Sequence, residues 1–405
     1  MLKLKNKKVK KCLLCGEKKL RKIFSLGNLF ISNFVSRKNI KKGLKAPLQL
    51  MYCRKCTLIQ LSHIAPQELM YKKYYWYKSG ITQTMREGLK DLYRSSLKHV
   101  KLNKNDLVLD IGANDGTLLK YYKSNGFKTI GCEPALNLKN ELKRNCKYII
   151  NNFWSKNSLD KLLKNHNLQK PKIITAIGMF YDLEYPNQFI KDAADSLHDE
   201  GIFIAQLMCL NSMVKQNDLG NICHEHIEFY SHKSLKYLFE KNGLEIFKIE
   251  ENNINGGSYR IYCRKFKRGS IKLKKENALD NIIKFKERIE KNKVNTLNFI
   301  DKQIKKGKKI FLYGASTKGN TMLQYYKLDQ SKIPFAAERS KSKWGKYTVG
   351  TGIKIISERE ARKKRPDYFL VTPWGFIKEF VKREKNWIKK GGKFILPFPF
   401  FKLVS

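Results

Sequence analysis

A short apolar run followed by a glycine turn constrains the fold of this chain more than any other feature. Residues 107–112 lead into the turn Gly112-Ala-Asn-Asp-Gly116, and residues 117–124 then have helical spacing. A second apolar run, residues 129–132, ends at Glu133. A strand, a glycine turn and a helix start present backbone N–H groups to a ligand, and an acid about 20 residues later is placed to bind a ribose diol. The pattern therefore predicts a ligand-binding βαβ unit.

The glycine turn also indicates which ligand this unit binds. It differs from the dinucleotide pattern G-x-G-x-x-G because Asn114 stands where the middle glycine is needed. The form D-x-G-x-x-x-G, from Asp110 to Gly116, fits S-adenosylmethionine better, since that molecule has no pyrophosphate to cradle. The predicted cofactor-binding residues are Asp110, Gly112, Asn114, Gly116, Glu133, Pro134 and Gly178.

The alternation of strands and helices continues through the middle of the chain. Residues 173–177 and 201–207 are expected to be strands, with a helix over residues 187–196 between them. This rhythm is typical of a doubly wound parallel sheet, which binds its ligand beyond the carboxyl ends of the strands. Residues 178–182 directly follow one such strand, so we expect them to line the same cleft.

A second α/β region follows a Lys/Glu-rich stretch, residues 267–307, which is expected to be a solvated amphipathic helix that serves as a spacer. Residues 309–313 read as a strand that enters the turn Gly314-Ala-Ser-Thr-Lys-Gly319-Asn-Thr321. The turn is similar to a phosphate-binding loop, but Asn320 occupies the position of the required lysine. Nucleotide hydrolysis is therefore not expected, whereas a helix N-terminus can receive a diphosphate without a metal.

Two C-x-x-C pairs near the start predict a metal site. Cys12 and Cys15 form one pair, and Cys53 and Cys56 form the other. Each pair has the spacing that wraps sulfur around tetrahedral zinc, and four thiolates leave no open position for a substrate. We therefore expect a structural Zn²⁺; the alternative is a group of reduced core cysteines. Nine cysteines in this arrangement suit a reducing cytosol better than a disulfide framework.

The segment 221–231 contains the stretch most typical of proton transfer. It holds His224, Glu225 and His226 in a chain that has only seven histidines. Two imidazoles around a carboxylate suit acid–base chemistry. The alternative is a His-x-His strand whose imidazoles share one solvated face or bind an incidental metal.

The net charge of +48 raises the question of a nucleic-acid partner. The lysines are spread over the whole length, so the charge indicates steering of a phosphorylated substrate more simply than nucleic-acid binding. The aromatic cluster in residues 71–80 could stack bases, pack a domain seam or donate a hydrogen bond into a neighbouring site, and packing is favoured. We expect a cytoplasmic protein, because neither a signal peptide nor an apolar run of about 20 residues is evident.

Taken in order, these features resemble one family, the three-part sugar C-methyltransferases of deoxysugar biosynthesis. The residues that carry the resemblance are the four cysteines, Tyr75, Tyr77 and Ser79, residues 111–116, Glu133 and Pro134, residues 224–226, residues 255–258, residues 313–315, Lys318 and Gly319, and residues 392–397. The resemblance covers nearly the whole chain. It implies a zinc-binding module in residues 1–75, an S-adenosylmethionine-dependent methyltransferase domain in residues 76–265 and a Rossmann-like domain in residues 266–405.

The resemblance also implies the reaction, which is methyl transfer to a carbon next to the ketone of a nucleotide-linked 4-keto deoxysugar. By analogy His226 is the base, Glu225 orients it or contacts the sugar, and Tyr77 donates a hydrogen bond to the enolate oxygen. The catalytic candidates are His226, Glu225, Tyr77 and His224. The substrate-binding candidates are Asp182, Asn255, Gly256, Tyr313 and Lys318.

The chain departs from the family at three places. Cys223 stands where many members have tyrosine, and Asp182 stands where many have histidine. In the last domain two usual elements appear only as Glu338-Arg339-Ser340 and Val349-Gly350-Thr351. Two other functions remain open. One is methyl transfer to a sugar hydroxyl or amine, and the other is a zinc-containing protein that binds or modifies RNA. The oligomeric state is not predicted.

Overall fold

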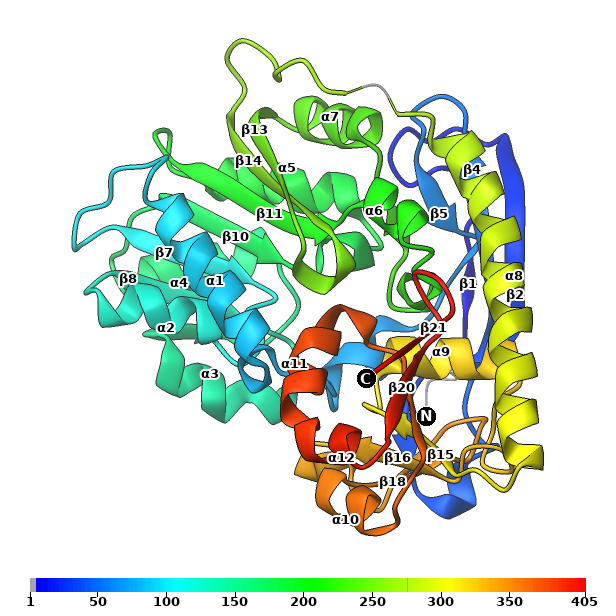
Figure 1. Cartoon of the computed structure of the whole chain (residues 1–405). Coiled ribbons are helices and arrows are strands. Elements are labelled where there is room, and N and C mark those ends of the chain that lie inside the picture. Colours follow the sequence, from blue (N-terminus) through cyan, green and yellow to red (C-terminus); the bar gives the residue numbers. More distant parts are fainter. Residues whose placement is uncertain (1–4, 275) are drawn as a thin grey trace.

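Three larger sheets organise the computed structural model, which describes residues 5–274 and 276–405 apart from the side chain of Asn255. They belong to an N-terminal module, a central domain and a C-terminal domain, all visible in Figure 1. No helix among the described residues has a stretch long and apolar enough to cross a membrane.

The central sheet has seven strands and confirms the predicted doubly wound architecture. From edge to edge they are β13 (Leu244–Asn252), β14 (Ser258–Lys265), β11 (Ile202–Met208), β10 (Ile173–Ile177), β7 (Leu107–Ile111), β8 (Lys128–Cys132) and β9 (Tyr148–Ile150). β14 pairs antiparallel with both of its neighbours, and the other pairs are parallel. Only residues 253–257 separate β13 from β14, which is too short for a parallel crossover.

Helices cover both faces of this sheet, which explains why its central strands β7, β10 and β11 are buried almost throughout. The helices are α1 (Gln83–Ser96), α2 (Thr117–Ser124), α3 (Lys139–Asn145), α4 (Lys156–Asn165), α5 (Pro186–Ser196), α6 (Leu210–Lys215) and α7 (His232–Lys241). Alternate residues of β7 belong to different cores. Val108 packs in the cluster with Leu92 and Leu119 of α1 and α2, whereas Leu109 packs in the cluster with Ile190 of α5.

The N-terminal module is built on a four-stranded sheet that includes a strand from the central domain. Its order is β12 (Glu228–Phe229), β5 (Ile59–Leu61), β4 (Lys45–Cys53) and β2 (Leu20–Phe30). Two short strands, β1 (Lys7–Lys8) and β6 (His63–Ile64), pair beside it. β12 lies two residues after His226, so the predicted acid–base segment is hydrogen-bonded into the sheet of the N-terminal module.

The C-terminal sheet is Rossmann-like, as predicted, and it also includes one strand, β3, from the N-terminal module. Its order is β21 (Lys402–Val404), β20 (Lys393–Leu396), β19 (Tyr368–Val371), β15 (Ile310–Tyr313), β16 (Phe335–Glu338), β18 (Lys354–Ser357), β17 (Tyr347–Thr348) and β3 (Phe34–Val35). The five strands from β20 to β18 are parallel. The helices of this domain are α9 (Thr317–Tyr326), α10 (Glu358–Lys363), α11 (Ile377–Arg383) and α12 (Lys385–Lys389). Through β3, the N-terminal module closes one edge of this sheet.

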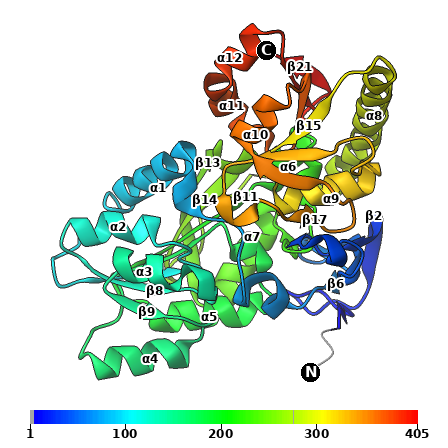
Figure 2. The same cartoon turned by 90° about the horizontal axis from the view of Figure 1, so that it is seen from below.

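The predicted amphipathic helix within residues 267–307 is confirmed, but its expected role as a solvated spacer is wrong. α8 (Ala278–Lys305) buries a row of side chains that includes Ile282, Phe285 and Ile289. The ring of Phe285 lies 6.2 Å, centroid to centroid, from Phe24 of β2. α8 runs beside β2 in both views (Figures 1 and 2). Its charged residues form only the outer face of a packed helix, because the apolar residues recur at helical spacing.

Candidate functional site

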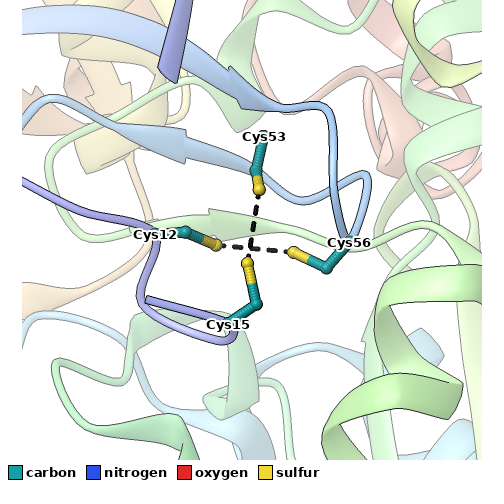
Figure 3. Close-up of side chains that lie close together, drawn as sticks. All are labelled: Cys12, Cys15, Cys53 and Cys56. Atoms are coloured by element: carbon teal, nitrogen blue, oxygen red, sulfur yellow. Dashed lines mark hydrogen bonds between the residues drawn. The ribbon is translucent and has the colours of Figure 1, made fainter. Parts of the chain in front are cut away.

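The four predicted cysteines meet at one point of the N-terminal module. Their sulfur atoms all lie within 4.8 Å of one another, and Figure 3 shows them converging from two loops. The Sγ of Cys12 lies 3.4 Å from that of Cys56, and the Sγ of Cys15 lies 3.4 Å from that of Cys53. Four mutually close thiols form the donor set of a structural zinc site, which lacks an open ligand position.

Local turns hold each cysteine pair in this arrangement. The N–H of Gly16 donates to the carbonyl of Cys12 at 3.0 Å, and the N–H of Thr57 donates to the carbonyl of Cys53 at 2.9 Å. Both donating residues have positive φ, +76° for Gly16 and +64° for Thr57. A residue just after each pair must therefore adopt a left-handed conformation, which glycine does without strain.

A single cavity of about 950 Å³ brings together residues from all three parts of the chain. One wall consists of the carboxyl ends of β7, β8 and β10, and another consists of the aromatic residues 74–77 and their neighbours. The loop before β12 and the start of α9 complete it. A cavity at the carboxyl ends of parallel strands is where this fold class binds its ligands.

The cofactor end of the cavity contains five of the seven predicted residues: Gly112, Asn114, Glu133, Pro134 and Gly178. Both oxygens of Glu133 accept backbone hydrogen bonds at 2.9 Å, one from Asn114 and one from Ala135. Each oxygen keeps a free lone pair for a ribose hydroxyl. Gly112 has φ +72°, and a Cβ there would lie 2.7 Å from the Cγ of Met179. This end of the cavity therefore fits S-adenosylmethionine. The carboxylate of Glu133 is held in place for the ribose, and the backbone at Gly112 has no side chain between it and the ligand.

The other two predicted cofactor residues support the turn from behind and are not among the residues that line the cavity. Asp110 is buried in β7 and accepts a hydrogen bond from the hydroxyl of Thr175 at 2.6 Å. Burial raises the pKa of Asp110 to about 7. Gly116, with φ +77°, precedes α2. These two residues shape the turn without facing its ligand.

His226 and His224 point in different directions. His226 lines the cavity, and its Nδ1 donates to the carbonyl of Asn221 at 2.8 Å. Nε2 is therefore left as the unprotonated nitrogen. Burial, reinforced by the charge of Lys318, holds the pKa of His226 well below its usual range. The Nε2 of His224 instead donates at 2.9 Å to the carbonyl of Ala46 in the N-terminal module. The orienting partner of His226 is thus the Asn221 carbonyl.

Two carboxyl groups and a thiol face the cavity near His226. Glu225 and Asp182 are each 8 % exposed, and Cys223 is fully buried. Burial raises the pKa of all three groups. Tyr77, which was predicted to donate a hydrogen bond, also lines the cavity and is 39 % exposed.

The predicted substrate-binding residues are divided between the cavity and the protein interior. Lys318 lines the cavity at the start of α9, and its Nζ donates to the Oδ1 of Asn221 at 2.8 Å. Tyr313 lies in the C-terminal core, where its hydroxyl donates to Glu384 at 2.7 Å, and it is not among the cavity-lining residues. Gly256 lies behind Trp374, whose ring would be 3.0 Å from a Cβ at that position. The side chain of Asn255 lies outside the described residues.

Several residues that line the cavity were not among the predicted site residues, although Tyr75 carried part of the family resemblance and Tyr181 belongs to residues 178–182, which were expected to line the cleft. Tyr71, Tyr75 and Tyr181 line it, and the ring of Tyr181 lies 4.4 Å, centroid to centroid, from that of His226. Lys343 and Trp374 line its C-terminal side. The tyrosines at 71 and 75 had a signal, since they belong to the aromatic cluster for which packing was favoured. Nothing in the sequence distinguished Lys343 from the many other lysines.

Three family models match the chain in order. They describe a zinc binding domain over residues 12–71, a methyltransferase domain over residues 83–249 and a C-methyltransferase C-terminal domain over residues 253–399. The chain is also similar to the C-methyltransferase NovU of Streptomyces niveus, with 25 % identity over 98 % of this chain and 97 % of that protein. These matches confirm the predicted set of domains.

Two similar solved structures each overlap less than half of this chain. The PH0226 protein of Pyrococcus horikoshii OT3 covers 47 % of this chain and 95 % of its own, with 15 % identity and a TM-score of 0.37. The magnesium protoporphyrin IX methyltransferase of Synechocystis PCC 6803, with bound SAM, covers 45 % of this chain and 79 % of its own, with 11 % identity and a TM-score of 0.34.

Proposed function

Because this chain is an S-adenosylmethionine-dependent methyltransferase with the three domains of the C-methyltransferases, we propose that it methylates a carbon next to the ketone of a nucleotide-linked 4-keto deoxysugar. One observation carries the proposal. A buried histidine with an unprotonated nitrogen shares a cavity with the anchored acid Glu133 and the cation Lys318. We place the domain boundaries between residues 75 and 76 and between residues 265 and 266.

In this proposal, His226 takes the proton from the carbon. A carbon acid next to a ketone needs a base that is unprotonated at neutral pH and lies within reach of the carbon. His226 meets the first condition because burial disfavours its charged form, and because Nδ1 is committed to the Asn221 carbonyl. Bound S-adenosylmethionine supplies the electrophilic methyl group. The task left to the protein is to hold the carbon in line with it.

The tyrosines of the cavity hold the enolate oxygen. Burial raises the pKa of Tyr71, Tyr75 and Tyr181, so these phenols keep their protons. The hydroxyl of Tyr71 already donates to the backbone carbonyl of Glu225 at 3.2 Å, which leaves Tyr75 and Tyr181 as donors to the substrate. Tyr77 joins them from the same cluster. Preorganised donors of this kind stabilise developing negative charge, each by roughly 3 to 4 kcal/mol where single donors have been removed.

The C-terminal side of the cavity receives the diphosphate of the nucleotide. α9 begins there, with Ser316 as its N-cap, and a helix N-terminus favours an anion. Lys318 and Lys343 place two cations on the same side. The net charge of +48 would draw such a substrate toward the protein.

The test is a mass spectrum of nucleotide sugars after incubation of the zinc-loaded protein with methyl-labelled S-adenosylmethionine and a panel of 4-keto deoxysugar nucleotides. We expect label on a ring carbon. Label on oxygen or nitrogen would replace the carbon acceptor with a hydroxyl or amine. The absence of transfer to every sugar, with S-adenosylmethionine binding intact, would refute the proposal, and RNA would then be tested as an acceptor.

A further inference from the structure

Asn221 joins the proposed base to the cation of the proposed diphosphate site. Its backbone carbonyl accepts the Nδ1–H of His226 at 2.8 Å, and its side-chain Oδ1 accepts from the Nζ of Lys318, also at 2.8 Å. Asn221 is 3 % exposed and is not among the described residues that line the cavity. Any effect of Asn221 on catalysis therefore passes through His226 or Lys318.

A third hydrogen bond fixes the orientation of the Asn221 amide. Its Nδ2 donates to the Oδ2 of Asp218 at 3.0 Å, and its backbone N–H donates to the carbonyl of Asp218 at 3.2 Å. Because Nδ2 can only donate, Oδ1 is the atom that faces Lys318, and the amide cannot turn over without losing both side-chain bonds. The connection between the cation and the base is thus a single residue with a fixed side chain.

This connection crosses from the central domain to the C-terminal domain. Asn221 and His226 precede β12, whereas Lys318 belongs to α9. Burial, and after it the charge of Lys318, lowers the pKa of His226. A diphosphate bound to Lys318 would offset that charge and make the imidazole a stronger base. The nucleotide end of a substrate can therefore act on the base that faces its sugar end.

We propose that Asn221 is a positioning residue that couples the two ends of the substrate, because a diphosphate held by Lys318 fixes the imidazole of His226 through Asn221. This inference rests on the proposed function. Binding energy from the nucleotide end is then used to align the base, so it appears in kcat as well as in KM. A keto sugar without its nucleotide should bind near His226 but lose its proton slowly.

The experiment supplies the two ends of the substrate as separate molecules. The zinc-loaded protein, with S-adenosylhomocysteine bound, is placed in D₂O with the methyl glycoside of the 4-keto deoxysugar. NMR reports exchange at the carbon next to the ketone, before and after inorganic pyrophosphate is added. At saturating glycoside, we expect pyrophosphate to raise the exchange rate of the wild type about tenfold. This measurement does not depend on the folding of any variant.

Asn221→Ala keeps the backbone carbonyl that orients His226 and removes the amide that Lys318 contacts. Pyrophosphate should still bind within about threefold of the wild-type affinity in calorimetry, because the ammonium of Lys318 remains. It should raise the exchange rate less than about twofold, and kcat for the nucleotide-linked sugar should fall about tenfold with little change in KM. A loss of packing alone would instead lower exchange by the same factor with and without pyrophosphate.

Asn320→Ala is the matched control. Asn320 is buried on α9, two residues after Lys318, and is not among the described residues that line the cavity. Its side chain donates to the carbonyl of Val349 and accepts from the hydroxyl of Thr351, each at 3.2 Å. This variant should keep the activation by pyrophosphate seen in the wild type. Folding of both variants is checked by S-adenosylmethionine binding.

The outcomes separate this inference from the proposed function. No activation of the wild type by pyrophosphate, or equal activation of the wild type and Asn221→Ala, would overturn the role of Asn221 and leave carbon methylation intact. Loss of activation in Asn320→Ala as well would also overturn it. The absence of exchange with the intact nucleotide-linked sugar would overturn the proposed function, and this inference with it.

Discussion

The substitution His226→Asn isolates the proposed base with little disturbance of the fold. The asparagine amide can occupy the position of Nδ1 and keep the 2.8 Å hydrogen bond to the Asn221 carbonyl. The atom that is lost is Nε2, the unprotonated nitrogen. Because the wild-type imidazole is already neutral, the variant buries no new charge and leaves no charged partner unpaired.

The expected loss of turnover follows from this single deletion. A positioned general base contributes about 10²- to 10⁴-fold, which corresponds to roughly 2.7 to 5.4 kcal/mol in the activation free energy. The wild-type rate should also stay flat as the pH falls through ~6.5, the usual pKa of imidazole. The sign follows from burial, which lowers the pKa of His226 and so keeps it unprotonated at that pH.

Proton transfer can be measured apart from methyl transfer. In D₂O, with S-adenosylhomocysteine in place of the methyl donor, NMR reports exchange at the carbon next to the ketone. We expect exchange and turnover to fall together in His226→Asn. His224→Gln is the control, since it keeps a donor toward Ala46 and its side chain lies outside the cavity-lining set. Exchange within about threefold of wild type in His226→Asn would refute the assignment of the base.

Three further predictions concern the metal, the substrate and stability in acid. Cys53→Ser should abolish zinc binding, worth on the order of 10 kcal/mol to folding, and lower the thermal unfolding temperature, whereas Cys263→Ser should retain zinc by atomic absorption. Lys318→Gln should weaken nucleotide-sugar binding about tenfold in calorimetry and leave S-adenosylmethionine binding unchanged. Burial opposes the shift at Glu245, but three backbone N–H groups and Arg264 lower its pKa to about 2. The ionised Glu245 therefore stabilises the folded state fully above about pH 4.5, and this stabilisation is lost as the pH falls toward 2. Between these pH values, refolding of Glu245→Gln should release about one proton less than refolding of the wild type, which an acid titration measures.

Features encoded by neighbouring residues could be predicted from the sequence. The Cys-x-x-Cys spacing, the strand that ends at Glu133 and the turn at Gly112 each depend on fewer than ten residues. The direction of side chains in irregular segments could not be predicted from the sequence. A strand-like alternation would place His224 beside His226, but the segment before β12 is a loop, and contact with Ala46 turns His224 away.

Contacts between residues far apart in the sequence could not be predicted from it either. Tyr313 ends a strand that leads into a glycine turn, as a ligand-binding residue would. Its direction is decided by Phe369 and Phe380, which lie more than 50 residues later and surround its ring. The side of a sheet that a strand residue faces depends on which helix covers that side, and the local pattern does not contain this information.

The pairing of β3 with β17 bears on the order in which the chain can fold during synthesis. Phe34 pairs with Thr348, so a strand made near the start has its partner more than 300 residues later. The N-terminal module leaves the ribosome long before β17 is synthesised. Until then the backbone groups of β3 that pair with β17 are exposed to water or to other chains. Such open edges invite mispairing. One edge of the C-terminal sheet therefore includes one of the first strands synthesised, and a truncation before β17 would leave β3 without its partner.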